Sequence, residues 1–245
     1  MSAVNVTLEN DFPTGAGLGG SSAASAALLT ALAECRGQKW DRVALAEEGR
    51  RIEVEDLGIA GGRQDHYAAT FGGALGLTFT TSVSVHRIPL SASIREDLSA
   101  RSILIYTGQS RISGDTIKAV LGAYEAGDSR VIGALHRMRE IAREMAGLIE
   151  RGDLDGVGVL LNEHWEHQRS LHASIPTQRI DAIVARSLRA GALGAKAMGA
   201  SGGGCVLIIA GADNVDRIRD VVRPLGEILD FRVDEEGVAI ESGKQ

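Results

Sequence analysis

The sequence predicts an α+β protein with two domains, and three observations lead to that fold class. The chain has 245 residues, enough for one large domain or two modest ones. A polar, irregular stretch at residues 91–99 interrupts the apolar patterns. After it, the expected elements follow the order strand, helices, strand, strand, helix, strand, which is the order of a split βαβ, or ferredoxin-like, domain. We therefore expect one domain over residues 1–98 and another over residues 99–245.

The first expected elements are a strand, a glycine-rich loop and a helix. Val4, Val6 and Leu8 alternate with polar residues, as in a half-buried strand, and residues 23–35 have a helical composition of mostly alanine and leucine. Because glycine has no Cβ, the intervening backbone can approach a phosphate closely, and the helix N-terminus attracts the anion. We call residues 13–22 the phosphate loop. Its expected binding residues are Pro13, Gly15, Ala16, Gly17, Leu18, Gly19, Gly20, Ser21 and Ser22.

Several interpretations compete for this loop. Gly15, Gly17 and Gly20 match the dinucleotide fingerprint G-x-G-x-x-G, but no strand ending in Asp or Glu follows the helix promptly. A Walker phosphate loop does not fit, because no lysine precedes Ser21 and Ser22. A plain glycine-rich turn before a serine-capped helix is a further interpretation. A dinucleotide-dependent oxidoreductase is thus one alternative function.

The rest of the first half is expected to contain two helices and a hairpin. Residues 40–57 and 64–70 are the helices, and residues 74–79 and 83–88 alternate as strands around a turn. Residues expected to face inward on the first of these helices are Val43, Leu45, Ala46, Ile52 and Val54.

The second half shows longer helical patterns between apolar strands. Helices are expected over residues 115–124, 128–150, 153–171, 177–190 and 213–222. Strands are expected over residues 102–107, 195–198, 205–210 and 228–233. Asp153 and Thr177 are the expected N-caps of their helices.

Composition excludes several classes of function. A net charge of −6 without a long basic run argues against nucleic acid as the main partner. No stretch is apolar and long enough to predict a membrane span, and the first residues do not resemble a signal peptide. Cys35 and Cys205 show neither disulfide nor zinc spacing, so we expect a reducing compartment and a cytoplasmic location.

Three stretches resemble the motifs of the GHMP kinases, the family of galactokinase, homoserine kinase, mevalonate kinase and phosphomevalonate kinase. The first is Pro13-x-x-x-Gly17-Leu18-x-x-Ser21-Ser22-Ala23 in the phosphate loop. The second is residues 61–73 and the third is residues 196–207, in family order. The resemblance implies a two-domain fold with a truncated N-terminal catalytic domain and a ferredoxin-like C-terminal domain, since the family's usual segment before the loop has no match. It also implies that the phosphate loop binds ATP.

The resemblance further implies roles for particular residues. Asp65 would accept or orient the proton of a substrate hydroxyl, although its local sequence equally suits an N-cap of the 64–70 helix. Glu53 would bind magnesium, Mg2+, together with Ser21, but spacing alone does not separate Glu53 from Glu55. The third stretch is a plain hairpin turn in the alternative interpretation. Its implied substrate-binding residues are Gly199, Ser201, Gly202 and Gly203.

Residues 61–73, 106–111 and 162–169 look like the branch that phosphorylates D-glycero-D-manno-heptose 7-phosphate. The resemblance therefore implies ATP-dependent phosphorylation of a sugar or sugar-phosphate hydroxyl, with Arg63 or Arg111 neutralising a substrate phosphate. A galactose- or fucose-type kinase, or an inactive nucleotide-binding fragment, are the alternatives within this interpretation.

Residues 162–169 also contain two histidines with helical spacing. His164 and His167 are three residues apart, which suits a metal site, but no third ligand is in view. Trp165, between them, is expected in the core.

Overall fold

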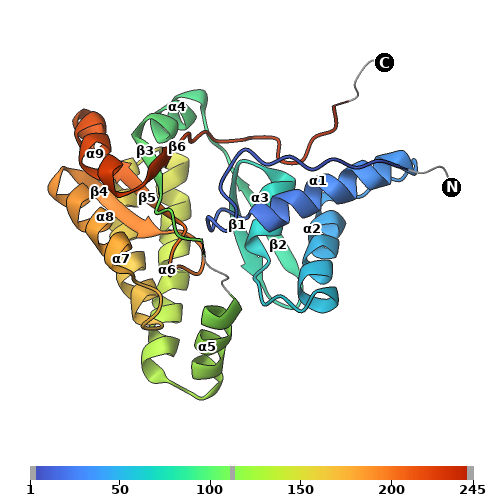
Figure 1. Cartoon of the computed structure of the whole chain (residues 1–245), viewed down its shortest axis with the longest axis horizontal. Coiled ribbons are helices and arrows are strands. Elements are labelled where there is room, and N and C mark those ends of the chain that lie inside the picture. The colour runs from blue at the N-terminus through green and yellow to red at the C-terminus, as the bar shows by residue number, and fades with distance from the viewer. Residues whose placement is uncertain (1–3, 111–113, 242–245) are drawn as a thin grey trace.

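The computed structural model describes residues 4–110 and 114–241, which form two lobes (Figure 1). The first lobe, blue to cyan, contains a group of helices and a hairpin. Its elements are α1 (Gly20–Cys35), α2 (Arg42–Arg51), the π-helical turn η1 (Ile52–Asp56), α3 (Gln64–Phe71), β1 (Ala74–Phe79) and β2 (Val83–Ile88). The hairpin is antiparallel, with Ala74 opposite Ile88 and Phe79 opposite Val83, which confirms both predicted strands.

The helices of the first lobe pack on one another through small residues and one buried aromatic. Asp41 caps α2 by accepting hydrogen bonds from the backbone N–H groups of Val43 and Ala44. Tyr67 on α3 is fully buried, and its hydroxyl donates to Glu47 Oε1 at 2.7 Å. Because Glu47 lies on α2, this bond fixes α3 against α2.

Three predictions for the first lobe are wrong in detail. Residues 4–10 are not assigned as a strand, and Val4 is 55% exposed, because the alternating pattern has no partner strand among the described residues. Val43 is 40% exposed rather than inward, since α2 turns its other face to α3. Helix α1 begins at Gly20, three residues before the predicted start, so Ser21 and Ser22 lie inside its first turn.

The second lobe contains the longer helices and a second sheet. Its elements are α4 (Ala92–Arg101), β3 (Ser102–Tyr106), α5 (Gly114–Glu125), α6 (Ser129–Arg151), α7 (Leu154–Ser170), α8 (Gln178–Arg189), β4 (Ala192–Ala197), β5 (Cys205–Ala210), η2 (Ala212–Asn214), α9 (Val215–Val222), η3 (Arg223–Leu225) and β6 (Glu227–Leu229). Asp153 and Thr177 cap α7 and α8 as predicted.

Two elements of the second lobe differ from the sequence-based expectation. Residues 91–99 are not irregular, because Ser91 caps α4 through a hydrogen bond from the Ile94 N–H. None of the α4 side chains is fully buried, and only Ile94 and Leu98 form an apolar pair at helical spacing on its partly buried face, which is a weak signal in the sequence. The last strand, β6, is shorter than predicted and ends at Leu229.

The second sheet has the strand order β4-β5-β3-β6 with antiparallel pairing throughout. This arrangement confirms the predicted split βαβ order. One face of the sheet, with Ile103 and Ile208, packs into the main apolar core together with Trp165 of α7, which confirms the prediction for that tryptophan. The opposite face carries Leu104 and Leu207 and packs against phosphate-loop residues, so the sheet positions the loop.

The segment after β6 joins the lobes a second time. It crosses from the second lobe to the first, as the red ribbon in Figure 1 shows. There Gly73 N–H donates to the Asp234 carbonyl at 2.5 Å, and the guanidinium of Arg87 donates to the Glu235 carbonyl at 2.6 Å. Within residues 4–110 and 114–241, no helix combines the length and apolar character that crossing a membrane requires.

Candidate active site

The phosphate loop runs directly into the N-terminus of α1. Gly15, Gly17 and Gly19 adopt φ values of +72°, +74° and +70°, a left-handed conformation that other residues adopt with strain. Gly19 is the N-cap of α1 and has no side chain, so no side-chain cap hydrogen bond is found there in the described part of the chain. The first N–H groups of α1 are therefore left for an anion.

The third stretch, residues 196–207, lies against this loop. Cys205 N–H donates to the Ala16 carbonyl at 2.8 Å. A Cβ added to Gly17 would lie 3.2 Å from the Met198 carbonyl oxygen, and one added to Gly199 would lie 3.2 Å from the Gly17 Cα. Both glycines are thus needed for the close approach of two backbones.

The four predicted residues of the third stretch differ in surroundings. Gly199 is exposed, whereas Ser201 is buried and adopts a φ of 68°. The Ser201 hydroxyl donates to the Ile175 carbonyl at 2.8 Å, and Gly202 N–H donates to the same oxygen at 2.9 Å. Gly203 is packed against the Gln109 carbonyl. In this structure the Ser201 hydroxyl thus stabilises the turn itself.

Glu53 joins the phosphate loop to α3. The Ser21 hydroxyl donates to Glu53 Oε1 at 2.9 Å, and His66 Nε2 lies 2.8 Å from Glu53 Oε2. Glu55 instead contacts Arg50 at 3.4 Å and is exposed. The geometry therefore separates the two glutamates that spacing left open, and it brings Glu53 to Ser21.

Asp65 lies at the end of the phosphate loop, in the first turn of α3. A Cβ placed on Gly19 would lie 3.1 Å from the Asp65 Cβ and 3.6 Å from its Oδ2. The N-cap of α3 is Arg63, and within residues 4–110 and 114–241 the Asp65 carboxyl makes no hydrogen bond or ion pair, so the N-cap interpretation is wrong. Although the residue is partly exposed, crowding by protein atoms raises the pKa of Asp65; Glu53 raises it further, and His66 opposes the shift.

Of the two predicted arginines, Arg63 is among the described residues and Arg111 is not. Arg63 lies two residues before Asp65, and its guanidinium is 3.7 Å from Glu47 Oε1. Arg111 lies outside the described residues. Ser110, directly before it, abuts Gly15, so the chain passes beside the phosphate loop on its way to Arg111.

The residues present fit a magnesium ion in the chemistry of their donors. The described residues contain no group of three or more His, Cys, Asp or Glu side chains placed to hold a metal. Ser21 and Glu53 nevertheless offer two neighbouring oxygens, and Mg2+ commonly takes one or two protein oxygens with phosphate oxygens and water.

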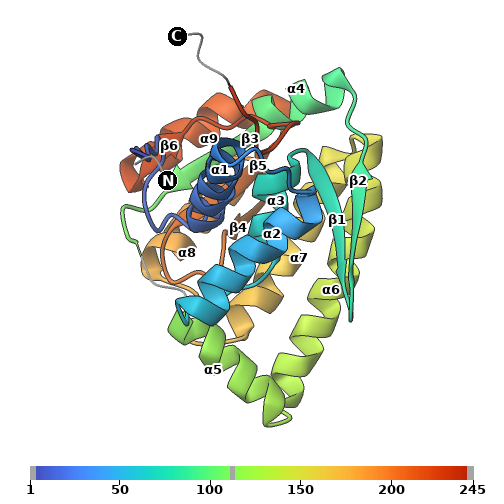
Figure 2. The ribbon, with the colours of Figure 1, turned by 90° about the vertical axis from the view of Figure 1, so that its right-hand side faces the viewer.

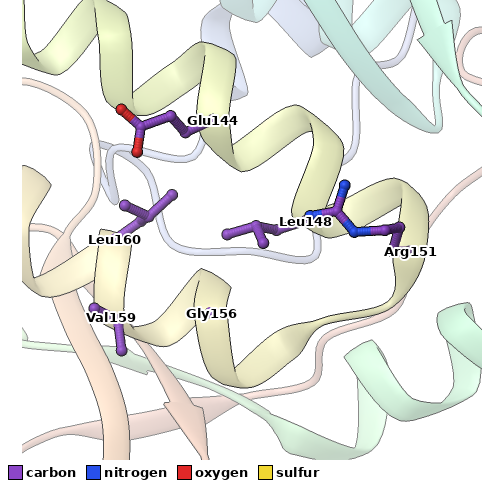
Figure 3. A pocket seen from close by; sticks show the side chains of 6 residues that line it. All are labelled: Glu144, Leu148, Arg151, Gly156, Val159 and Leu160. Carbon is purple, nitrogen blue, oxygen red and sulfur yellow. The ribbon is translucent and has the colours of Figure 1, made fainter.

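A hollow of about 510 Å3 lies elsewhere, between α6 and α7 (Figure 3). Leu148 and Leu160 line its floor, with Glu144 and Arg151 at its margin. None of its lining residues belongs to the predicted site, so this hollow is separate from the phosphate loop.

Sequence reasoning missed two residues of the site. His66 is buried and contacts Glu53, yet its only sequence signal is its position after Asp65. Lys196 opens the third stretch, but nothing in the sequence indicates that burial lowers its pKa to about 8.

A glycine loop at a helix N-terminus, with a Ser–Glu pair and a neighbouring carboxyl, defines a phosphate-handling enzyme of the small-molecule kinase class. Comparison with known proteins agrees: the model for the N-terminal domain of the GHMP kinases matches residues 2–73, and that for their C-terminal domain matches residues 145–227. The chain belongs to the GHMP kinase family, whose two-domain fold it shows, and it is a phosphotransferase of the sugar kinase type.

Individual relatives extend this finding. A D-glycero-alpha-D-manno-heptose 7-phosphate kinase from Campylobacter jejuni is 29% identical over 232 residues, covering 94% of this chain and 68% of the relative. A mevalonate kinase from Aeropyrum pernix is 30% identical over 243 residues, covering 96% and 70%. The crystal structure of a D-glycero-D-manno-heptose 1-phosphate kinase from Bacteroides thetaiotaomicron superposes with a TM-score of 0.70 at 26% identity, covering 96% and 67%. The chain thus spans about two thirds of the length of these relatives.

Proposed function

We propose that this chain transfers the γ-phosphoryl group of ATP to a hydroxyl of a heptose phosphate, with D-glycero-D-manno-heptose 7-phosphate as the acceptor. The observation that carries the proposal is the meeting of Ser21, Glu53 and Asp65 at the N-terminus of α1. The names of two relatives, a heptose 7-phosphate kinase and a heptose 1-phosphate kinase, support the choice of sugar.

In this proposal the phosphate loop holds the triphosphate of ATP. The left-handed glycines bring the backbone close to the phosphates, and the first N–H groups of α1 donate to their oxygens. The positive end of the helix dipole adds to the attraction. Gly199, on the exposed side of the third stretch, lies beside Gly17 and borders the same space.

Ser21 and Glu53 would hold Mg2+ in the loaded enzyme. The ion supplies neutralisation of the charge on the phosphate oxygens, which is its usual part in phosphoryl transfer. His66 holds Oε2 of Glu53, so that Oε1 stays directed at Ser21. The protein therefore fixes both oxygen ligands before any substrate binds.

Asp65 would accept or orient the proton of the attacking hydroxyl. Its carboxyl lies next to Gly19, at the end of the loop that holds the phosphates, and is free of side-chain partners within the described residues. A raised pKa makes this carboxylate a stronger base than an ordinary aspartate. Positioning of the two reactants then contributes most of the acceleration.

Two arginines remain as candidates for a substrate phosphate: Arg63, which lies near Asp65, and Arg111, which lies outside the described residues. The proposed boundary between the domains at residues 98 and 99 falls inside α4 (Ala92–Arg101), the helix that leads into the second lobe. Cys35 and Cys205 are free thiols, which supports a reducing, cytoplasmic location.

The test is ATP-dependent turnover measured by ADP release in the presence of Mg2+. D-glycero-D-manno-heptose 7-phosphate, galactose and fucose are offered separately to the same preparation. We expect turnover with the heptose phosphate and little with the other two sugars. Preferred turnover of galactose or fucose would replace the heptose assignment, and no turnover of any sugar would favour a nucleotide-binding protein.

A further inference from the structure

Lys196 carries a positive charge that the protein does not neutralise. It lies on β4, directly before the glycine-rich turn, and no hydrogen bond or ion pair is found for its ammonium group in residues 4–110 and 114–241. Lys196 is half-buried, and crowding by the surrounding protein atoms lowers its pKa to about 8. Holding a charged group away from water without a partner is unfavourable, so this lysine is expected to serve a ligand.

Buried polar atoms of α7 also lack hydrogen-bond partners in the described part of the chain, and one of them belongs to His164, which senses the charge of Lys196. Burial first, and then the charges of Lys196 and His167, lower the pKa of His164 to about 4, so His164 is neutral at pH 7. Among the described residues, His164 Nδ1 is buried without a hydrogen bond, and so is Oε1 of Gln168 one turn later. Nε2 of Gln168 donates to the Gly199 carbonyl at 2.9 Å, which ties this face of α7 to the third stretch.

Glu163, the residue before His164 on α7, already has a positively charged partner. Glu163 accepts hydrogen bonds from the Arg137 guanidinium at 2.6 and 2.9 Å, and His167 lies 4.0 Å from the same carboxyl. Glu163 thus has its own cation, and the charge of Lys196 remains open to an anion from outside the protein.

The backbone holds this cluster in place. The Asn162 side chain donates to the Leu193 carbonyl at 2.8 Å and accepts from Ala195 N–H at 3.0 Å, as a neighbouring strand would. The backbones of Gly158 and Gly194 touch, and any Cβ at either position would collide with the other segment. Helix α7 is therefore locked along the edge of β4.

Strand geometry places Lys196 on the face of the sheet that packs against the phosphate loop. Ala195 and Ala197 face the main core, so Lys196 points to the opposite face, where it pairs in register with Leu207. That face packs against the phosphate loop. Met198, whose carbonyl lies against Gly17, is two residues away, roughly 7 Å along the strand.

We propose that Lys196 and His164 bind the phosphate group of the sugar-phosphate acceptor. The ammonium would pair with a phosphate oxygen, and neutral His164 with its proton on Nδ1 would donate to another. This inference rests on the proposed function only for the identity of the sugar. The phosphate site itself follows from the unpartnered groups, and it differs from the earlier assignment because Arg63 already has Glu47 beside it.

The test is calorimetric titration without turnover. Inorganic phosphate, D-glycero-D-manno-heptose 7-phosphate and the heptose lacking the phosphate are titrated into the protein, with ADP present to occupy the phosphate loop. Lys196→Met is compared with Lys118→Met, which removes the same charge from an exposed position on α5. His164→Leu serves as the second variant, and it also supplies the comparison if Lys196→Met does not fold.

We expect Lys196→Met to bind heptose 7-phosphate about 10- to 100-fold more weakly, the usual effect of losing a charged hydrogen bond. Binding of the unphosphorylated heptose should be unchanged, and Lys118→Met should match the wild type. Equal phosphate binding by Lys196→Met and wild type would overturn the site, as would a wild type that binds neither phosphate compound. The titration measures binding and not ADP release. A protein that failed the turnover assay could therefore still show, or fail to show, this phosphate site.

Discussion

Glu53 and Lys196 belong to different lobes and differ in how many partners hold them. Both oxygens of Glu53 have partners, Ser21 and His66, from the first lobe. Lys196, on the second lobe, has no partner within the described residues, and the buried Nδ1 of His164 also lacks one. If the proposed function holds, the groups for phosphate and magnesium are already arranged before substrate binds, whereas the site for the acceptor is completed only when the acceptor binds.

The largest expected effect is the loss of turnover in Asp65→Asn, a change in the first lobe beside the phosphate loop. Removing the base should lower kcat by about 1,000-fold. Because Asp65 has no side-chain partner in the described chain, the unfolding temperature should not fall. The measurements are steady-state turnover and thermal unfolding. Asp56→Asn, which removes an exposed carboxylate paired with Arg51 at 3.0 Å, is the control for turnover. Unchanged turnover in Asp65→Asn would remove Asp65 from the mechanism.

The next effect in size separates the two neighbouring glutamates. Glu53→Gln should lower turnover on the order of 100-fold and raise the Mg2+ concentration needed, since a charged ligand is lost. Glu55→Gln should leave both unchanged, because Glu55 is exposed and its ion pair in the described part of the chain is with Arg50 on the surface. Binding of Mg2+ in the presence of ADP, followed by calorimetry, gives a readout besides turnover. Equal effects of the two substitutions would contradict the assignment of Glu53.

A smaller effect is expected when the support behind Glu53 is changed. His66→Leu should weaken Mg2+ binding in the presence of ADP by about 10-fold, the lower end of such positioning effects. His66→Gln keeps a donor and should recover part of the affinity. If His66→Gln bound Mg2+ no better than His66→Leu, the hydrogen bond to Glu53 would not be what positions it.

The smallest expected effect is on the free energy of unfolding, and it tests whether Lys196 lacks a partner in the folded protein. The pKa of Lys196 is about 8 when folded and 10.5 as its ordinary value, so the folded state binds fewer protons between these values. Stability of the wild type should therefore rise with pH from about 8 to 10.5. Lys196→Met should be more stable at pH 7 by about 1–3 kcal/mol, with the difference shrinking over that window. Urea unfolding at several pH values is the measurement, and a less stable Lys196→Met would indicate a structural role.

Much of the site was predictable because glycine patterns constrain the backbone directly. The phosphate loop and the third stretch were both identified, and the structure brings Gly17 against Gly199. Glu53 could not be separated from Glu55, because the π-helical turn at residues 52–56 changes which side chains share a face. The electrostatic effect of Lys196 on His164 links residues 32 positions apart, because α7 packs on β4.

The fold, too, was predictable only in part. The order of strands in the second lobe followed from the sequence, since apolar alternation and helix caps both marked the elements. The strand expected at Val4 to Leu8 is absent from the described structure, because alternation indicates only a suitable side-chain pattern and pairing needs a neighbouring strand. Helix α4 was missed because its cap, Ser91, and the apolar pair Ile94 and Leu98 are weak signals within an otherwise polar stretch.

The most direct test of the account is detection of the product by 31P NMR after incubation with ATP, Mg2+ and D-glycero-D-manno-heptose 7-phosphate. The account predicts a second phosphoester on the heptose phosphate, formed by the wild type and not by Asp65→Asn. Release of ADP and inorganic phosphate without a sugar bisphosphate would show that ATP reaches the phosphate loop but that the acceptor does not. That result would contradict the assignment of this chain as a kinase of a heptose phosphate.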